Sequence, residues 1–138
     1  MPRTFCLLNH QLTPKQLEEL EFKFQSTSVI CSPEFLAQKW SQITPEESRE
    51  MVADAVINWL QENHAEQGDL FIIQGEFGCT FTLVDYALQH GLVPLYATTV
   101  RRAKESREGE QVRREYIFEH AGFKKYQYWQ NTRGGRIK

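Results

Sequence analysis

The feature of the sequence that most constrains the fold is a glycine-spaced turn at residues 74–80 (Gln-Gly-Glu-Phe-Gly-Cys-Thr). The apolar run 70–73 before it is typical of a buried strand, and residues 81–90 after it have a helical pattern. A strand that enters a helix through such a turn leaves free backbone N–H groups at the positive end of the helix dipole. The turn therefore predicts a site for phosphate or another anion.

With 138 residues the chain is expected to form one domain, residues 1–130, followed by a basic and flexible tail at residues 131–138. Its apolar runs are too short to span a bilayer, and the residues after Met1 do not resemble a signal peptide. A cytoplasmic protein without membrane contact is expected. Cys6, Cys31 and Cys79 form no CxxC pair, and buried free thiols are the expected state.

The net charge of −2 hides two halves of opposite sign. Residues 1–99 hold 5 Lys/Arg and 13 Asp/Glu, a balance of −8, whereas residues 100–138 hold 11 and 5, a balance of +6. Such segregation is typical of an anionic ligand or a charge-complementary self-contact. A solvated basic tail is the alternative explanation. The acidic first 99 residues argue against a broad surface for long nucleic acid.

Strand-like and helix-like segments alternate along the chain. Capping-box patterns at 13–16 and 44–47 predict helix starts, and the second helix should bury a stripe that includes Met51. Strands are expected at residues 4–8, 27–31, 70–73, 92–99 and 111–119, the last one returning as an antiparallel hairpin after a charged loop at 101–109. This alternation predicts a three-layer α/β sandwich with a mostly parallel sheet.

In such sheets ligands bind outside the carboxyl ends of the strands, where the strand order reverses. This rule selects three polar strand exits as one shared site: residues 9–10, 74–80 and 98–101. The candidate residues are His10, Glu76 and Arg101 for chemistry, and Asn9, Gln74, Gly75, Phe77, Gly78, Thr80, Thr98 and Thr99 for ligand contact. Each also has a structural explanation: Thr80 as a helix cap, His10 and Asn9 as turn residues, and Arg101 as a solvated side chain.

Several familiar sites do not fit the sequence. The turn at 74–80 lacks the Gly-Lys-Ser/Thr ending of a Walker loop, and its two glycines do not complete the dinucleotide pattern GxGxxG. No His, Cys or carboxylate set has the spacing of metal ligands, and no Ser-His-Asp nucleophile elbow occurs. No cofactor or metal is therefore expected.

Taken together, the motifs resemble a family of small CRISPR-associated, CARF-like ring nucleases of type III systems. The resemblance is carried by residues 7–13 (Leu-Leu-Asn-His-Gln-Leu-Thr), by the turn at 74–80, and by 94–99 (Pro-Leu-Tyr-Ala-Thr-Thr) followed by Arg101. Residues 118–120 and 123–126 add a C-terminal signature, so the likeness covers nearly the whole chain. It implies a Rossmann-like homodimer that binds a cyclic oligoadenylate, with cyclic tetra-adenylate as the expected ring, and cleaves it to end an antiviral signal.

A metal-independent mechanism would use the ribose 2′-OH as the attacking group and would leave a 2′,3′-cyclic phosphate. His10 or Glu76 would transfer the proton, while Arg101 and the turn amides near Gly78 would stabilise the phosphorane. Three alternatives remain open: a sensor that binds the ring without cleaving it, a generic nucleotide- or nucleic-acid-binding domain, and a structural subunit whose charged halves pair between protomers.

Overall fold

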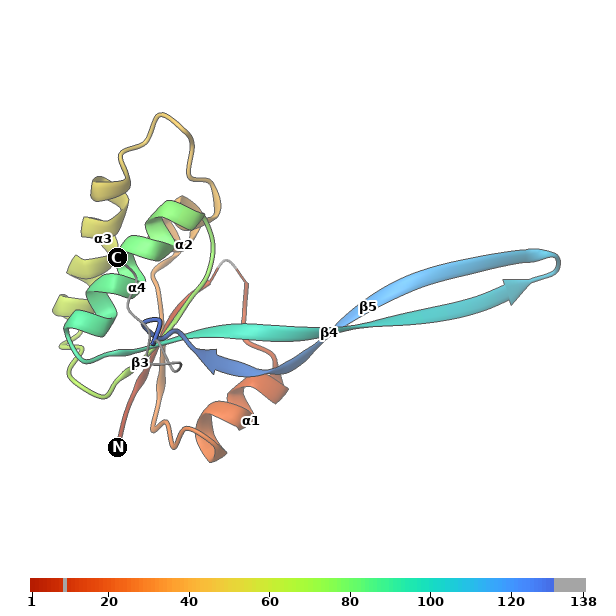
Figure 1. The fold of residues 1–138 in the computed structure, drawn as a ribbon, viewed down its shortest axis with the longest axis horizontal. Coiled ribbons are helices and arrows are strands. Elements are labelled where there is room, and N and C mark those ends of the chain that lie inside the picture. The colour runs from red at the N-terminus through yellow and green to blue at the C-terminus, as the bar shows by residue number, and fades with distance from the viewer. Residues whose placement is uncertain (9, 131–138) are drawn as a thin grey trace.

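The computed structural model describes residues 1–8 and 10–130, which form one five-stranded sheet with helices on both faces (Figure 1). The strands are β1 (Thr4–Leu7), β2 (Val29–Cys31), β3 (Leu70–Ile73), β4 (Val93–Glu108) and β5 (Gln111–Lys125). Their order is β2-β1-β3-β4-β5, with the first four parallel and β5 antiparallel to β4. The predicted Rossmann-like α/β sandwich with a C-terminal antiparallel hairpin is confirmed. The predicted tail at 131–138 lies outside the described residues.

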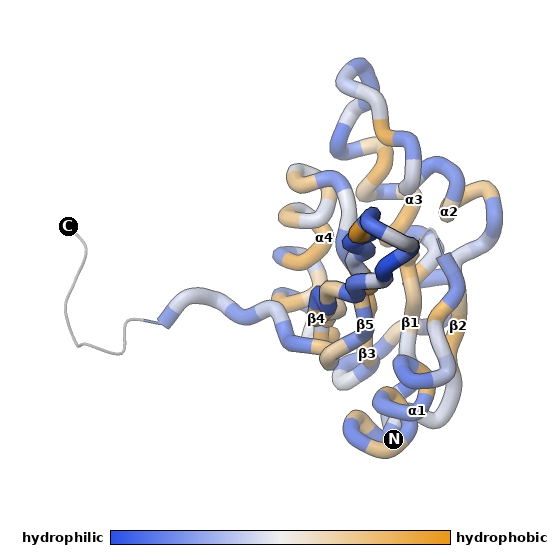
Figure 2. Tube along the Cα trace, turned by 90° about the vertical axis from the view of Figure 1, so that its right-hand side faces the viewer, coloured by the Kyte–Doolittle hydropathy of each residue, from blue (hydrophilic) through white to orange (hydrophobic). Residues whose placement is uncertain are grey.

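The two faces of the sheet are covered unequally (Figure 2). The helices are α1 (Pro14–Phe22), α2 (Glu34–Ser41), α3 (Arg49–Glu62) and α4 (Phe77–Gln89). Helices α2, α3 and α4 pack on the face that carries Phe5 and Phe71, whereas α1 alone packs on the face of Ile72 and Leu95. None of the helices in the described residues combines the length and apolar character that a membrane crossing requires.

Strands β1 and β3 form the centre of the sheet, and every residue in them is buried. Strands covered on both faces need continuous apolar runs rather than alternating ones, and Phe5, Phe71 and Ile73 have no exposed surface at all. Burying one such side chain contributes about 1.5–3 kcal/mol. The two short apolar runs of the sequence thus become the two central strands.

The predicted start of α1 is confirmed. The Thr13 hydroxyl accepts a hydrogen bond from the Gln16 amide at 3.2 Å, and the Gln16 side chain accepts one from the Thr13 amide at 2.9 Å. This reciprocal pair satisfies two N–H groups that the helix itself cannot use. Leu20 on the inner side of the helix is buried, whereas Leu17 is largely exposed.

The predicted start of the next long helix at residues 44–47 is wrong. Helix α3 begins at Arg49, and its N-cap is Ser48, whose hydroxyl accepts a hydrogen bond from the Met51 amide. Glu47, which a capping box at 44–47 requires, instead pairs with the Lys39 ammonium at 2.8 Å. The helix therefore starts later, and Met51 points to solvent with 73% of its surface exposed rather than joining the buried stripe.

The expected charged loop at residues 101–109 is also wrong, because β4 continues through it to Glu108. Strands β4 and β5 pair along a hairpin that projects far from the sheet (Figure 1), and every residue from 100 to 118 is exposed. We call residues 100–118 the arm. Both of its faces meet water, so its sequence lacks the apolar alternation that identifies a strand. Ion pairs across it, such as Arg114 with Glu105 at 2.9 Å, accompany the pairing.

The expectation of buried thiols holds for Cys6 and Cys79 and is wrong for Cys31, which is exposed. Cys6 and Cys31 are register partners on β1 and β2 although they are far apart in sequence. Burial, together with the nearby Cys31, raises the pKa of Cys6 to about 12, so its thiol stays protonated at neutral pH.

Candidate functional site

The carboxyl ends of β1 and β3 lie side by side at one edge of the sheet, next to the part of β4 that continues beyond its pairing with β3. Leu7 pairs with Ile73, and Ile72 pairs with Leu95, so the residues that follow these strands are neighbours. The strand order reverses between β1 and β3, since β2 lies on one side of β1 and β3 on the other. This is the switch point at which open α/β sheets bind ligands.

Gln74 joins the exit of β3 to β4. Its side-chain oxygen accepts a hydrogen bond from the Ala97 amide at 2.7 Å, two positions beyond the last paired residues of the two strands. Its backbone oxygen accepts a hydrogen bond from the Trp40 indole N–H at 3.0 Å. The predicted ligand residue therefore has a structural role, and two of its polar atoms are already engaged.

Gly75 has to be a glycine because of Trp40. A Cβ atom at this position would lie 2.7 Å from the Trp40 Nε1 atom and 2.9 Å from Cε2. Trp40 is 4% exposed and belongs to the core beneath α2 and α3, so it has little room to move. The first glycine of the turn thus serves the packing of the indole.

Glu76 occupies the anion position that the sequence predicted. It is the N-cap of α4, and its carboxylate accepts hydrogen bonds from the Gly78 amide at 2.6 Å and the Cys79 amide at 3.3 Å. Contact with the Cys79 thiol and the hydrogen bonds from these amides lower the pKa of Glu76, so it is ionised at neutral pH. The free amides expected at this helix end are occupied by the protein's own carboxylate.

The remaining residues of the turn have different surroundings. Cys79 is buried, and desolvation followed by the Glu76 carboxylate raises its pKa to about 12, which makes it a poor nucleophile. Thr80 is not the helix cap: its amide donates to the Glu76 carbonyl, and its hydroxyl oxygen is buried without a partner among the described residues. Phe77 is 91% exposed at the first turn of α4.

His10 is exposed after β1, and its Nδ1 atom lies 3.1 Å from the Gln11 carbonyl oxygen. It therefore keeps a ring nitrogen available at the switch point. Asn9, its predicted companion, lies outside the described residues.

The predicted residues of β4 separate into two groups. Thr98 donates its hydroxyl to the Gly122 carbonyl at 2.6 Å, and Thr99 beside it is exposed. Arg101 lies three residues further along the strand, roughly 10 Å away at the rise of an extended chain. Its guanidinium stacks 4.4 Å from the ring centre of Tyr116 on the arm. The predicted strand exit at residues 98–101 is therefore wrong, because β4 continues through it to Glu108. The edge of the sheet places Gln74 beside the middle of β4, while Arg101 lies at the base of the arm.

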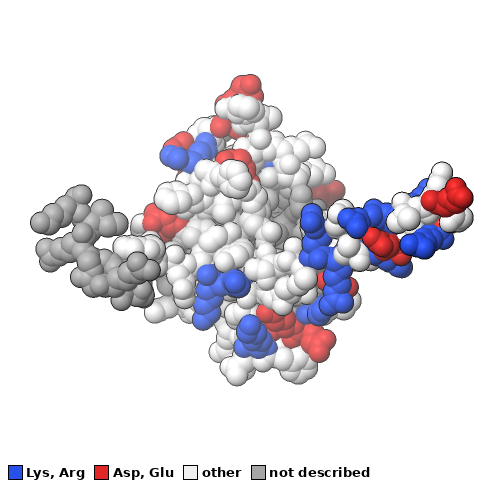
Figure 3. Space-filling model, turned by 45° about the vertical axis from the view of Figure 1, so that its right-hand side comes forward, with Lys and Arg blue, Asp and Glu red and all other residues white. Residues whose placement is uncertain are grey.

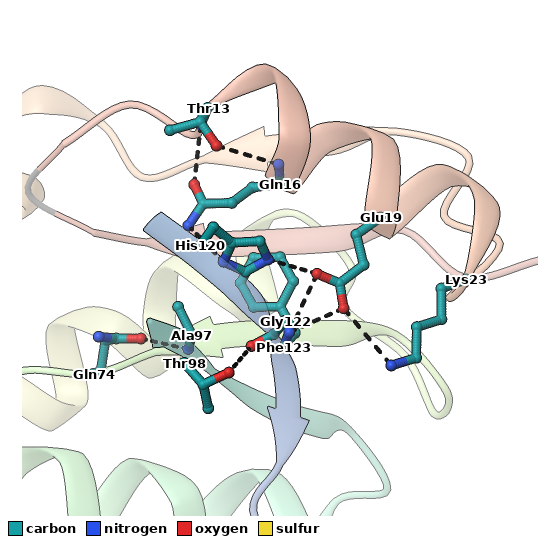
Figure 4. A network of polar contacts seen from close by, with 10 residues as sticks. All are labelled: Thr13, Gln16, Glu19, Lys23, Gln74, Ala97, Thr98, His120, Gly122 and Phe123. Carbon is teal, nitrogen blue, oxygen red and sulfur yellow. Dashed lines mark hydrogen bonds and ion pairs between the residues drawn. The ribbon is translucent and has the colours of Figure 1, made fainter. Parts of the chain in front are cut away.

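A second polar cluster, which sequence reasoning did not single out, lies on the opposite face beneath α1 (Figure 4). His120 donates from Nε2 to the Glu19 carboxylate at 2.5 Å, and its Nδ1 atom accepts from the Gln16 side chain at 3.4 Å. Glu19 also accepts from the Phe123 amide at 2.9 Å. The His120 side chain is only 6% exposed. This cluster ties α1 to the base of the arm.

A β-bulge directs His120 into this cluster. Thr98 pairs with Gly122 and Thr99 with His120, so Ala121 is an extra residue in β5. In a regular strand, positions 120 and 123 face opposite sides, and the bulge brings His120 and Phe123 to the same side, with ring centres 4.8 Å apart. The sequence around His120 contains no pattern that predicts the bulge or the inward direction of this side chain.

Within the described residues, no group of three or more His, Cys, Asp and Glu side chains is placed to hold a metal ion. The candidate site is instead an edge built from backbone exits, with exposed polar side chains around the switch point.

These features define a doubly wound α/β domain with a polar switch-point edge and a projecting hairpin. The chain belongs to the family described as "Uncharacterized protein MJ1673 family", whose model matches residues 2–124. It is 33% identical over 132 residues to "Uncharacterized protein MJ1673" of Methanocaldococcus jannaschii, with 91% of this chain and 98% of that protein covered. No solved structure matches the chain.

Proposed function

We propose that the protein binds a cyclic oligoadenylate at the switch-point edge and cleaves the ring to linear products. The observation that supports the location is that the polar residues following β1 and β3 lie beside β4 where the strand order reverses. The identity of the ligand comes from the resemblance of the motifs at residues 7–13 and 74–80 to CARF-like ring nucleases. Cyclic tetra-adenylate is the proposed substrate, and a two-fold dimer would match its symmetry.

The proposed reaction needs no external nucleophile. The ribose 2′-oxygen attacks the adjacent phosphorus, the bond from phosphorus to the 5′-oxygen breaks, and the products carry a 2′,3′-cyclic phosphate and a 5′-hydroxyl. One group must take the proton from the 2′-OH, and a proton must reach the leaving 5′-oxygen. His10 is proposed for proton transfer because it is exposed after β1 and an imidazole can both accept and donate a proton.

Glu76 is proposed to regulate access to the helix N-terminus. A ligand phosphate reaches the amides of Gly78 and Cys79 only if the Glu76 carboxylate rotates away from them. The two anions compete for the same donors, so removal of the negative charge should favour the ligand. Glu76→Gln is therefore expected to tighten ring binding, whereas a catalytic Glu76 would lose cleavage on the same substitution.

A second candidate function, binding of the ring without cleavage, is favoured by the same geometry. The lowered pKa of Glu76 and its hydrogen bonds to the helix remove it as a proton shuttle at neutral pH. The described residues then offer one exposed histidine at the edge, His10, for both proton transfers. A protein that binds the ring without cleaving it would need no proton transfer.

The test is incubation of the purified protein with an excess of cyclic tetra- or hexa-adenylate, with and without chelator, followed by chromatography of the products. His10→Ala is compared with His90→Ala, because His90 is also exposed but lies at the opposite end of α4. Loss of cleavage in the first variant alone supports the assignment. An intact ring that remains bound supports the sensor, and a ring that does not bind overturns both functions.

A further inference from the structure

The arm exposes so much of its surface that we expect it to be covered by a partner. The strands of residues 100–118 pair with β4 and β5 alone and lie outside the three-layer body (Figure 1), with both faces in water. A two-stranded hairpin of this kind is marginally stable by itself. Its base is nonetheless held firmly by the His120–Glu19 cluster and by the Thr98–Gly122 hydrogen bond. The base of the arm is held in place while the rest of the arm is exposed, so the arm can bind a partner without first becoming ordered.

One face of the arm is more apolar than a solvated strand requires. The register places Phe118 beside Arg101, Tyr116 beside Ala103, and Val112 further along the same face. Phe118 is 67% exposed, Val112 56% and Tyr116 48%. Arg114 interrupts this row, so the face does not alternate regularly, but three large apolar side chains exposed on one face of a two-stranded hairpin are typical of a surface that packs against a partner. We call Val112, Tyr116 and Phe118 the aromatic face of the arm.

Charge indicates what covers this face. The arm holds six Lys/Arg and four Asp/Glu, two of the latter next to Gly109 at its tip. Basic side chains gather along its shaft (Figure 3). The first 99 residues have a balance of −8, and four of their five cations already pair with carboxylates of the same region. Among the residues that the structure describes, nine of the thirteen carboxylates in residues 1–99 form no ion pair, and the shaft of an arm supplies cations for them.

We propose that the arm of one chain docks through its aromatic face on the acidic body of a second copy, which returns its own arm in the same way. Every chain carries both surfaces, so a reciprocal exchange closes as a two-fold dimer. Docking of arm against arm would instead bring two basic shafts together. The contact follows from the geometry of the arm and does not depend on ring cleavage.

Two variants that differ only in the face of the arm test the contact by sedimentation and light scattering of the full chain without ligand. The pair Val112→Ser and Phe118→Ser removes two of the three residues of the aromatic face. The pair Val100→Ser and Ile117→Ser removes two exposed apolar residues from the opposite face. The first change is expected to weaken the dimer at least about tenfold and the control less than threefold, since one buried aromatic contact is worth about 1.4 kcal/mol or more. Salt should weaken the wild-type dimer.

These side chains are exposed in the single chain, so circular dichroism should show that both variants remain folded. A wild-type protein that is monomeric at 100 µM, or equal effects of the two variants, would overturn the proposal. A photo-crosslinking phenylalanine analogue at position 116, in mixed light and heavy chains, locates the contact. Inter-copy links to residues 1–99 support it, and links between arms overturn it. A monomer that binds long RNA in a salt-sensitive way would make the arm a nucleic-acid surface instead.

Discussion

Replacement of Gly75 by alanine should be costly for a reason that lies in one neighbour. The backbone of Gly75 is not in the left-handed region, so an alanine is acceptable to the chain itself. Its Cβ atom, however, would lie 2.7 Å from Trp40 Nε1, well inside van der Waals contact. Trp40 would have to move away from the core and would lose its 3.0 Å hydrogen bond to the Gln74 carbonyl.

The magnitude follows from two contributions. Forcing a side chain into a packed core costs about 1–3 kcal/mol. The hydrogen bond adds about 1 kcal/mol. Gly75→Ala should therefore lower the free energy of unfolding by about 2–4 kcal/mol, measured by urea denaturation with tryptophan fluorescence and circular dichroism.

Gly78→Ala is the matched control from the same turn. Its Cβ atom would meet mainly the end of the Glu76 side chain at 3.2 Å, which can rotate aside. Alanine also favours the helix by about 1 kcal/mol over glycine, so this variant should lie within about 1 kcal/mol of wild type.

A double-mutant cycle with Trp40→Phe isolates the clash, because phenylalanine lacks the indole nitrogen that Cβ approaches most closely. The two substitutions should couple by about 1–3 kcal/mol. If Gly75→Ala costs less than about 0.5 kcal/mol, or costs the same beside Phe as beside Trp40, the packing argument is wrong.

Three further predictions concern carboxylates with distinct roles. The pKa of Glu76 is lower in the folded protein than in the unfolded chain, so its negative charge stabilises the fold at pH 7. This stabilisation is lost as the pH falls through the pKa of the folded state. Glu76→Gln should therefore lower Tm at pH 7 and have less effect on Tm in acid. Asp69 is 2% exposed and accepts from the Arg3 and Glu66 amides, so Asp69→Asn should cost about 2–3 kcal/mol in urea unfolding, and an unchanged midpoint would contradict this role. Glu19→Gln should speed hydrogen exchange at the Phe123 amide by about tenfold or more, because this amide donates to the Glu19 carboxylate. Equal protection in both proteins would show that Glu19 does not hold the base of the arm in place.

The turn after β3 forms as predicted, but the group bound at the N-terminus of its helix is a side chain of the protein itself. Its strand–turn–helix context was readable from the sequence, and α4 does begin there. The expected anion at the helix N-terminus is Glu76 itself, which is part of the motif. Any ligand phosphate at this position therefore competes with a carboxylate already in place, which makes Glu76 the residue to substitute when ligand affinity is measured.

The position of Arg101 changes the size of the candidate site. The strand-exit rule groups Arg101 with the switch-point residues, but it lies on the arm with its guanidinium against Tyr116. In the proposed dimer, arms reach from one copy to the other.

The sequence by itself determined the order of strands and helices, because each depends on neighbours in the chain. The apolar runs at β1 and β3 need burial on both faces, and the Thr13–Gln16 capping box is complete within four residues. The likeness of the strand exits to a switch-point site also followed from this order, because parallel strands bring their carboxyl ends to one edge.

Only the tertiary structure decided the features that depend on distant partners. The requirement for glycine at 75 comes from an indole in α2, and the late start of α3 accompanies the pairing of Glu47 with Lys39. The charged segment after Thr99 is a strand because β5 pairs with it, and the bulge at Ala121 turns His120 toward Glu19. Each of these outcomes is set by contacts between residues far apart in the chain, for which local pattern carries no information.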